Sequence, residues 1–84
     1  MITIKLDSRL LLKPLNPDIP VEMDGHYLVI QVPAGRSVQQ ALKDLNIQLS
    51  QAVAAVVNGQ TTDLEEPLKP GDEVHLLPQI AGGD

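Results

Sequence analysis

Apolar residues occupy every second position in two segments of the N-terminal half, residues 2–6 and 27–32. A period of two is typical of a β-strand that buries one of its faces. Asp24-Gly25, just ahead of the second segment, is a dipeptide that favours a tight turn. We therefore predict two strands here, the second of which begins directly after a turn.

The spacing of apolar residues changes at residues 38–45. They recur there at intervals of three and four, as on one face of an amphipathic helix: Val38, Ala41, Leu42 and Leu45. Ser37 stands at the N-cap position and Gln40 follows three residues later, which is the arrangement of a capping box. The pattern predicts a helix that starts after Ser37 and ends near Asn46.

Further strands are predicted in the C-terminal half. Residues 53–57 are apolar at every position, which favours an interior strand covered on both faces. Asn58-Gly59 is a strong tight-turn dipeptide, and a short return strand is predicted at residues 60–62. The last strand is predicted at residues 73–78.

Two connections are less regular. Closely spaced prolines exclude regular structure between residues 14 and 20, so this stretch is predicted as a loop or an irregular edge segment. Residues 8–12 are compatible with either a helical turn or an extension of the first strand. Residues 63–70 are predicted to form a polar connection that Leu64 and Leu68 pin to the core.

Together these elements predict an α+β fold, a mixed sheet of four to five strands with one main helix packed across one face. The helix connects the first strands to the second half, and the last strand is expected beside the first, in the middle of the sheet. One domain is predicted at residues 1–78. A flexible C-terminal tail that carries Gly-Gly is predicted at residues 79–84.

Composition narrows the classes of function. Tyr27 is the only aromatic residue and cysteine is absent, so we expect an aliphatic core, without disulfides or thiolate metal sites. The formal net charge of −5 argues against nucleic acid as a partner, because phosphate contacts require clustered Lys and Arg. No apolar run approaches the roughly 20 residues of a membrane-spanning helix. We therefore expect a cytoplasmic domain with protein partners.

The polar residues form no constellation for catalysis. His26 and His75 have no further ligand at metal-binding spacing. Ser8, Ser37 and Ser50 lack the partners of a nucleophilic serine, and the glycines match neither a phosphate-binding loop nor a dinucleotide fingerprint. We therefore expect neither a bound metal nor a bound cofactor.

An acidic group lies in the connection at residues 63–70. It consists of Asp63, Glu65 and Glu66. Charged residues in a loop are usually solvated, and this is the favoured interpretation. The alternative is a surface that meets a basic patch on a partner, because opposite charges steer proteins towards each other.

Three motifs stand in sequence before the C-terminal end: Val56-Val57-Asn58-Gly59, Leu68-Lys69-Pro70-Gly71-Asp72-Glu73-Val74 and Leu77-Pro78-Gln79-Ile80-Ala81-Gly82-Gly83. With the order of the elements, they resemble the β-grasp, ubiquitin-like sulfur carriers, which include the small subunit of molybdopterin synthase (MoaD) and the thiamine sulfur carrier (ThiS). Ser8-Arg9-Leu10 is similar to the Ala-Arg-Leu of the molybdopterin type. The resemblance implies a β-grasp fold and a carrier rather than an enzyme.

The resemblance also implies a chemistry for the tail. An E1-like adenylating enzyme would use ATP to activate the carboxylate of Gly83, and a sulfur donor would displace AMP to leave a thiocarboxylate. Gly82 and Gly83 would supply a slender backbone for this step. A sulfur-acceptor synthase would then use the sulfur in cofactor or amino-acid biosynthesis. The molybdopterin type is favoured, and thiamine, cysteine or methionine synthesis are alternatives.

Asp84 departs from the family pattern, because the active form of these carriers ends at the second glycine. Some related carriers have a short extension that a JAMM-type metallopeptidase removes, and we hypothesise cleavage between Gly83 and Asp84. Two other functions stay open: a non-catalytic β-grasp binding or regulatory module, and a ubiquitin-like modifier that is conjugated to lysines.

An apolar docking patch is predicted beside the tail. Alternation in the last strand turns His75 and Leu77 away from the core. An isolated exposed leucine needs no functional explanation. Next to Pro78, Ile80 and Ala81, however, Leu77 is expected to form a small surface that binds the E1-like partner.

Overall fold

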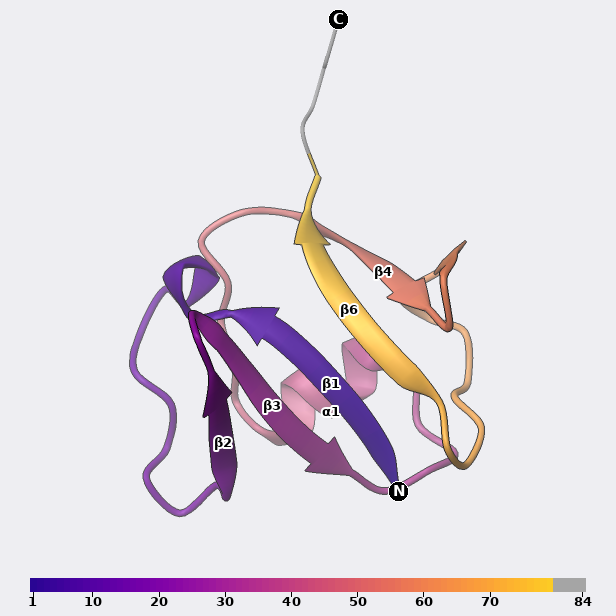
Figure 1. Cartoon of the computed structure of the whole chain (residues 1–84), viewed down its shortest axis with the longest axis horizontal. Coiled ribbons are helices and arrows are strands. Elements are labelled where there is room, and N and C mark those ends of the chain that lie inside the picture. The colour runs from indigo at the N-terminus through magenta and orange to yellow at the C-terminus, as the bar shows by residue number, and fades with distance from the viewer. Residues whose placement is uncertain (80–84) are drawn as a thin grey trace, which may run out of the picture.

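The computed structural model describes residues 1–79. Figure 1 shows them as a twisted sheet with an α-helix behind it. In chain order the elements are β1 (Ile2–Asp7), the 3₁₀ turn η1 (Ser8–Leu10), β2 (Val21–Asp24), β3 (Tyr27–Val32), α1 (Val38–Asp44), β4 (Val53–Val57), β5 (Gln60–Thr62) and β6 (Glu73–Pro78). These elements confirm the predicted α+β class.

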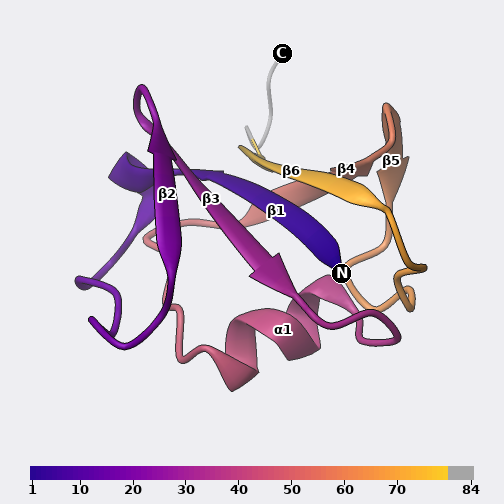
Figure 2. The same ribbon diagram turned by 60° about the horizontal axis from the view of Figure 1, so that its bottom comes forward.

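The strands form one mixed sheet in the order β2-β3-β1-β6-β4-β5. β6 runs parallel to β1, with Ile4 opposite Val74, and the other neighbouring strands are antiparallel. α1 covers one face of the sheet (Figure 2). The opposite face, called the open face below, has no helix over it within residues 1–79. The predicted place of the last strand, beside the first and in the middle, is confirmed.

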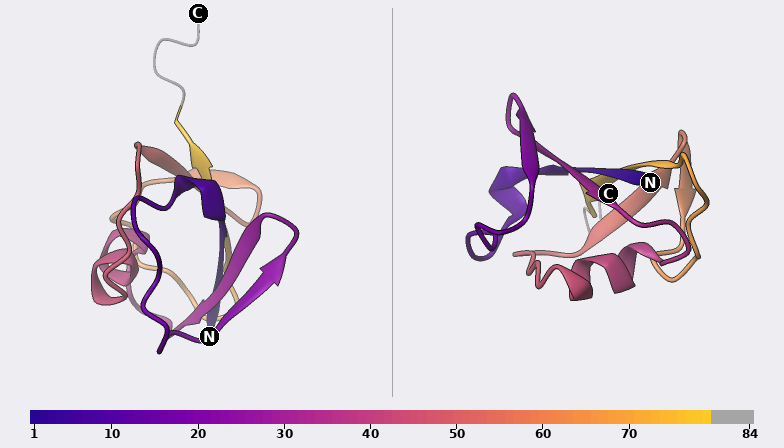
Figure 3. Two further views of the ribbon diagram at one scale, coloured as in Figure 1. Left: turned by 90° about the vertical axis from the view of Figure 1, so that its left-hand side faces the viewer. Right: turned by 90° about the horizontal axis from the view of Figure 1, so that it is seen from below.

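Figure 3 shows α1 lying along one face of the sheet. The buried core is aliphatic, as the composition predicts. Its largest fully buried side chains are Ile2, Ile4, Leu6, Ile30, Leu76, Val38 and Val74. The strands contribute every second residue, because successive side chains point to opposite faces. Burying one such side chain stabilises the fold by about 1.5–3 kcal/mol. The alternation read from the sequence therefore also identifies the face that α1 covers.

The sheet has six strands, so the predicted number of four to five is wrong. The missed strand is β2, which pairs with β3 along its whole length. Val21 is half-buried and Met23 is exposed, so the apolar alternation of β2 spans only four residues and buries little. It is held by its backbone ladder and by a turn at Gly25, whose φ of 62° fits the predicted Asp-Gly turn.

β4 is interior in the order of the sheet, as its apolar run predicts, but it is covered on one face only. Val53 and Ala55 are buried on the side of α1, whereas Ala54 and Val56 are half-buried on the open face. The expectation of burial on both faces is therefore wrong. A single short helix cannot cover two faces, and the open face keeps apolar side chains near its centre.

The helix prediction is confirmed at both ends. Ser37 Oγ accepts a hydrogen bond from the N–H of Gln40 at 3.1 Å, which satisfies one of the unpaired amides of the first turn. Asn46 follows the helix with a φ of 55°. The N–H of Ile47 donates to the carbonyl oxygen of Leu42 at 2.9 Å, which is the long bond of a Schellman motif.

Long-range backbone hydrogen bonds hold the segment after β1. Of the two structures predicted for residues 8–12, a helical turn or an extension of the first strand, the helical turn is confirmed: residues 8–10 form a 3₁₀ turn. Beyond this turn, the N–H of Leu12 donates to the carbonyl oxygen of Gln48, and the N–H of Ser50 donates to that of Leu10, both at 2.8 Å. The segment is therefore attached to the connection between α1 and β4.

The connection between β5 and β6 is also attached to the body of the fold. Leu68 is 3% exposed and belongs to the core, and Leu64 packs against the core while partly buried. The prediction that these two leucines pin residues 63–70 is confirmed.

Candidate functional site

The root of the tail, defined here as residues 77–79, leaves the sheet beside β4 (Figure 1). The parallel ladder with β1 ends at Leu76, whereas the antiparallel ladder with β4 continues to Pro78. The N–H of Gln79 then donates to the carbonyl oxygen of Ala52 at 2.9 Å. β4 therefore fixes the position and direction in which the chain leaves the sheet. The predicted domain boundary after residue 78 stays a prediction.

An apolar strip lies on the open face next to this root. Leu77 is 42% exposed, as its outward alternation predicts, and its cross-strand partner is Ala54. His75 is half-buried and its partner is Val56. Side chains paired across an antiparallel ladder lie about 4.5–5.5 Å apart at Cβ, so these four form one continuous surface. We call Leu77, Ala54, Val56 and His75 the open-face patch.

The structure brings together only part of the predicted docking surface. Leu77 and Pro78 are both exposed at the end of β6. The other predicted residues, Ile80 and Ala81, lie outside the described residues, and so do the predicted activation and cleavage positions Gly82, Gly83 and Asp84. Sequence reasoning missed Ala54 and Val56. The uninterrupted apolar run at residues 53–57 was the signal, but it was interpreted as burial on both faces.

A fixed cation lies at the end of β1. Arg9 donates from Nε to Asp7 Oδ1 at 3.1 Å and from Nη2 to Asp7 Oδ2 at 2.8 Å. Two parallel bonds of this kind orient the guanidinium. The side-chain hydrogen bonds from Arg9, with the bond from its backbone N–H, lower the pKa of Asp7 to about 2. Asp7 in turn raises the pKa of Arg9. At neutral pH both groups are therefore charged.

A second charged group borders the open-face patch at the start of β6. Glu73 accepts a hydrogen bond from His75 at 3.3 Å, and its carboxylate lies 3.4 Å from Lys5 Nζ on β1. The bond with His75, followed by that with Lys5, holds the pKa of Glu73 below its ordinary value. Such exposed pairs contribute little to stability. They do place charges of both signs around an apolar centre.

The turn between β4 and β5 positions the start of β6. Asn58 and Gly59 have φ values of 51° and 86°, the left-handed pair that a two-residue type I′ hairpin turn requires. The Asn58 side-chain oxygen accepts a hydrogen bond from the N–H of Glu73 at 3.0 Å, and the Asn58 N–H donates to the Glu73 carbonyl oxygen at 3.0 Å. The turn motif therefore also sets the register of β6 against β4.

The described part of the chain contains no candidate metal site, no membrane-spanning helix and no reactive serine. No group of three or more His, Asp or Glu residues within residues 1–79 could hold a metal ion. Within the same range, no helix is long and apolar enough to cross a membrane. Ser37 serves as the helix N-cap, and the Ser8 and Ser50 backbones bond to the carbonyls of His26 and Leu10. The candidate site is therefore the tail, its root and the open-face patch.

Comparison with known proteins identifies the family. The model of the ThiS family matches residues 17–83. This stretch includes the open-face patch and the three sequence motifs, the last of which ends in Gly82-Gly83. Neither the curated proteins nor the solved structures gave a match.

Proteins of the matched family have a common role. ThiS-family carriers are activated by E1-like enzymes of the ThiF and MoeB type, and they are carriers without catalytic activity of their own. The sheet with one helix across it agrees with the β-grasp fold. The chain therefore belongs to the ThiS family of β-grasp sulfur carriers.

Proposed function

We propose that the chain carries sulfur on the carboxyl group of Gly83. The observation that supports this best is the position of the root: a central strand, β6, ends beside an exposed apolar patch, and Gly82-Gly83 follow a few residues later. Two residues without side chains can enter a narrow cleft, and proteins recognise extended chain ends through backbone groups. The family match, which runs to residue 83, supports the same position.

The proposed chemistry has two steps at the Gly83 carbonyl carbon. A carboxylate oxygen attacks the α-phosphorus of ATP, and pyrophosphate leaves, giving an acyl adenylate on the E1-like enzyme. A sulfur nucleophile at the oxidation level of sulfide then attacks the carbonyl carbon. AMP leaves with the oxygen, and a thiocarboxylate remains. Adenylation is needed because a free carboxylate is a poor electrophile. The chain itself supplies the carboxyl group and the docking surface.

The peptide bond after Gly83 has to be cleaved first, because Asp84 follows it. In the chain that retains Asp84, the Gly83 carbonyl belongs to an amide, so Gly83 has no carboxylate oxygen that could attack ATP. We propose that a JAMM-type metallopeptidase hydrolyses this bond, so that water supplies the second carboxylate oxygen of Gly83 and aspartate is released.

The open-face patch is proposed as the docking surface for the E1-like enzyme. Leu77 is its most exposed member and stands at the root itself, so a partner that covers Leu77 also holds the start of the tail. Apolar contacts at the centre of an interface carry most of its binding energy, and the surrounding charges guide orientation. Pro78, Ile80 and Ala81 are proposed to extend this contact along the tail.

The proposed pathway is molybdopterin synthesis, in which a synthase accepts the sulfur. The support is the similarity of Ser8-Arg9-Leu10 to the Ala-Arg-Leu of the molybdopterin type. This segment forms the turn η1, and Arg9 bonds to Asp7 there. Thiamine synthesis and cysteine or methionine synthesis are the alternatives. ThiS-family carriers are generally cytoplasmic, and we propose the same location for this chain.

A matched pair of chains tests the proposal in vitro. One chain ends at Gly83 and the other keeps Asp84, and each is incubated with the E1-like enzyme of its host, ATP and sulfide. Intact-mass analysis should find one oxygen replaced by sulfur in the first chain and no change in the second. Equal activation of both chains, or activation of neither, would contradict the assignment of Gly83.

A further inference from the structure

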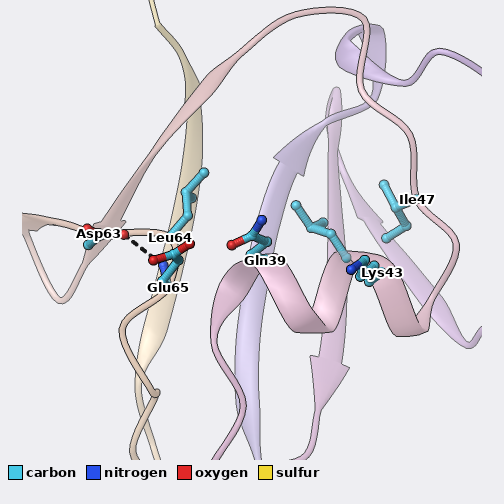
Figure 4. Close-up of a pocket in the computed structure, with 7 residues that line it drawn as sticks. Gln39, Lys43, Ile47, Asp63, Leu64 and Glu65 are labelled. Atoms are coloured by element: carbon cyan, nitrogen blue, oxygen red, sulfur yellow. Dashed lines mark hydrogen bonds between the residues drawn. The ribbon is translucent and has the colours of Figure 1, made fainter.

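A groove lies on the side of the molecule that the proposed sulfur chemistry does not use. It has a volume of about 660 Å³ and runs between α1 and the connection from β5 to β6 (Figure 4). Its lining residues are Gln39, Leu42, Lys43, Ile47, Asp63, Leu64 and Glu65. We call it the helix groove. α1 lies on the face opposite the open-face patch, so the two surfaces can be covered at the same time.

The floor of the helix groove is apolar and is fixed by the end of α1. Ile47 packs into the core at 8% exposure, while Leu42 is partly buried. The backbone bond from Ile47 to Leu42 closes the Schellman motif, and a hydrophobic contact between these two positions commonly accompanies it. Leu64 completes the floor from the opposite side (Figure 4). An apolar side chain from a partner would therefore find a preformed surface.

The opposite wall is an acidic turn that is attached to the helix. Asp63 accepts hydrogen bonds at Oδ1 from the Glu65 N–H, at 2.9 Å, and at its carbonyl oxygen from the Glu66 N–H, at 3.1 Å. The carbonyl oxygen of Leu64 accepts from the N–H of Gln39, in the first turn of α1, at 3.0 Å. The carboxylates of Asp63 and Glu65 therefore line the groove, on a turn whose backbone is already ordered, and Glu66 follows them directly in the sequence.

The charges of this rim are available to a partner. None of the ion pairs formed between residues 1–79 involves Asp63, Glu65 or Glu66. Lys43, the one basic residue that lines the groove, is not in any of those pairs either. The acidic wall is therefore complementary to a basic side chain, and the apolar floor is complementary to an aliphatic one.

We propose that the helix groove binds a basic, apolar peptide segment of a second protein while the tail is engaged elsewhere. The partner's aliphatic side chains rest on Leu42, Ile47 and Leu64. Its Lys or Arg side chains face Asp63 and Glu65. This proposal does not rest on sulfur transfer, since it involves neither the tail nor the open-face patch. It assigns a function to the acidic group that the sequence alone leaves open.

The test is a titration of the isotope-labelled full chain with a defined probe, the blocked peptide Lys-Leu-Ala-Lys-Leu-Ala-Lys. Amide resonances of Gln39, Lys43 and Glu65 should shift, while those of the open-face patch should stay in place. Two control peptides carry glutamate in place of lysine or serine in place of leucine, and both should bind at least about threefold more weakly.

Charge variants on the two sides of the groove should act in opposite directions. Glu65→Lys should weaken binding of the lysine–leucine peptide roughly three- to tenfold, because an attraction becomes a repulsion of similar size. Lys43→Glu should strengthen it by roughly threefold or more, for the converse reason. The matched control is Glu22→Lys on β2, which makes the same charge change outside the groove and should alter affinity less than about twofold in physiological salt.

The proposal is overturned by any of four results. The first three are the absence of binding, shifts centred on another surface, and an equal loss of affinity in Glu65→Lys and Glu22→Lys. Equal binding of the serine peptide would also overturn it, because the apolar floor would then contribute nothing. The ¹H–¹⁵N spectrum of each variant reports whether it is folded, so a loss of binding is separated from a loss of structure.

Discussion

Asn58 Nδ2 donates a hydrogen bond to Asp72 Oδ1 at 2.9 Å, which joins two motifs that stand apart in the sequence. Asp72 Oδ2 accepts from the N–H of Lys69 at 2.8 Å, so each oxygen of this carboxylate serves a different turn. One turn ends β4, and the other begins β6. Together they set the register that places Leu77 opposite Ala54. The motifs that contain Asn58 and Asp72 therefore fix the start of β6, and through its register they position the root of the tail at its end.

Loss of this connection should destabilise the fold. Asp72→Ala removes two hydrogen bonds to the turns, each with a net contribution of about 0.5–1.5 kcal/mol, so we expect a total loss of about 1–3 kcal/mol in the free energy of unfolding. Asn58→Gly also removes two side-chain bonds but keeps the left-handed backbone that residue 58 requires. Denaturant unfolding measures both variants.

The double variant separates the connection from the individual residues. Because Asn58 and Asp72 share one bond, their effects should not add, and the double-mutant cycle should give a coupling of about 0.5 kcal/mol or more. Additive effects would mean that the two turns act independently.

A charge in the open-face patch should weaken binding of the activating enzyme. Leu77→Asp places a carboxylate in the proposed apolar contact. We expect at least about a fivefold loss of affinity by titration calorimetry, since a central contact contributes more than about 1 kcal/mol. Ile80→Asp should have the same direction. The control is Leu12→Asp, at a leucine that is 62% exposed in the loop after η1. Equal affinity of Leu77→Asp and wild type would exclude the patch as the docking surface.

Asp7 should give the fold a specific response to acid. Its pKa in the folded protein, about 2, is below the ordinary value of 3.8. The ionised carboxylate therefore stabilises the fold above pH 3.8, and this contribution disappears as the pH falls towards 2. Arg9→Gln should return the pKa towards 3.8, as measured by an NMR titration of the Asp7 carboxyl carbon.

The control for this titration is Arg36→Gln. Arg36 pairs with Asp44, the last residue of α1, and does not contribute to the lowered pKa of Asp7. Its loss should therefore leave that pKa in place. A midpoint of the Asp7 titration near 3.8 in the wild-type protein would show that the pair with Arg9 does not form in solution.

The helix N-cap should make a measurable contribution to stability. Ser37→Ala leaves the N–H of Gln40 without its side-chain acceptor, and we expect a loss of about 1 kcal/mol in the free energy of unfolding. Ser37→Asp should recover most of it, because aspartate accepts the same bond. Ser50→Ala, at an exposed serine, should change stability by less than about 0.5 kcal/mol. Similar losses in the two alanine variants would argue against the cap.

Sequence patterns predicted the elements whose causes are local. The helix was predicted from its N-cap and its apolar stripe. The turn after β4 was predicted from Asn58-Gly59, two residue types that tolerate positive φ. β2 was missed because its alternation of Val21 and Met23 with charged residues is only four residues long and buries little, so the strand depends on its ladder with β3.

The missed part of the site has a similar physical reason. An apolar run such as residues 53–57 looks the same whether one or both faces of its strand are covered, so only the arrangement of layers reveals Ala54 and Val56 on the open face. The helix groove depends on the bond between Gln39 and Leu64, two residues far apart in the sequence. Neither feature has a local pattern that identifies it.

The central claim is that Gly83 becomes the reactive end of the chain in the cell. Intact-mass analysis of the protein purified from its native host tests this directly. We predict a chain that ends at Gly83 with one oxygen replaced by sulfur. A chain that retains Asp84 while the sulfur pathways of the host are active would contradict the account.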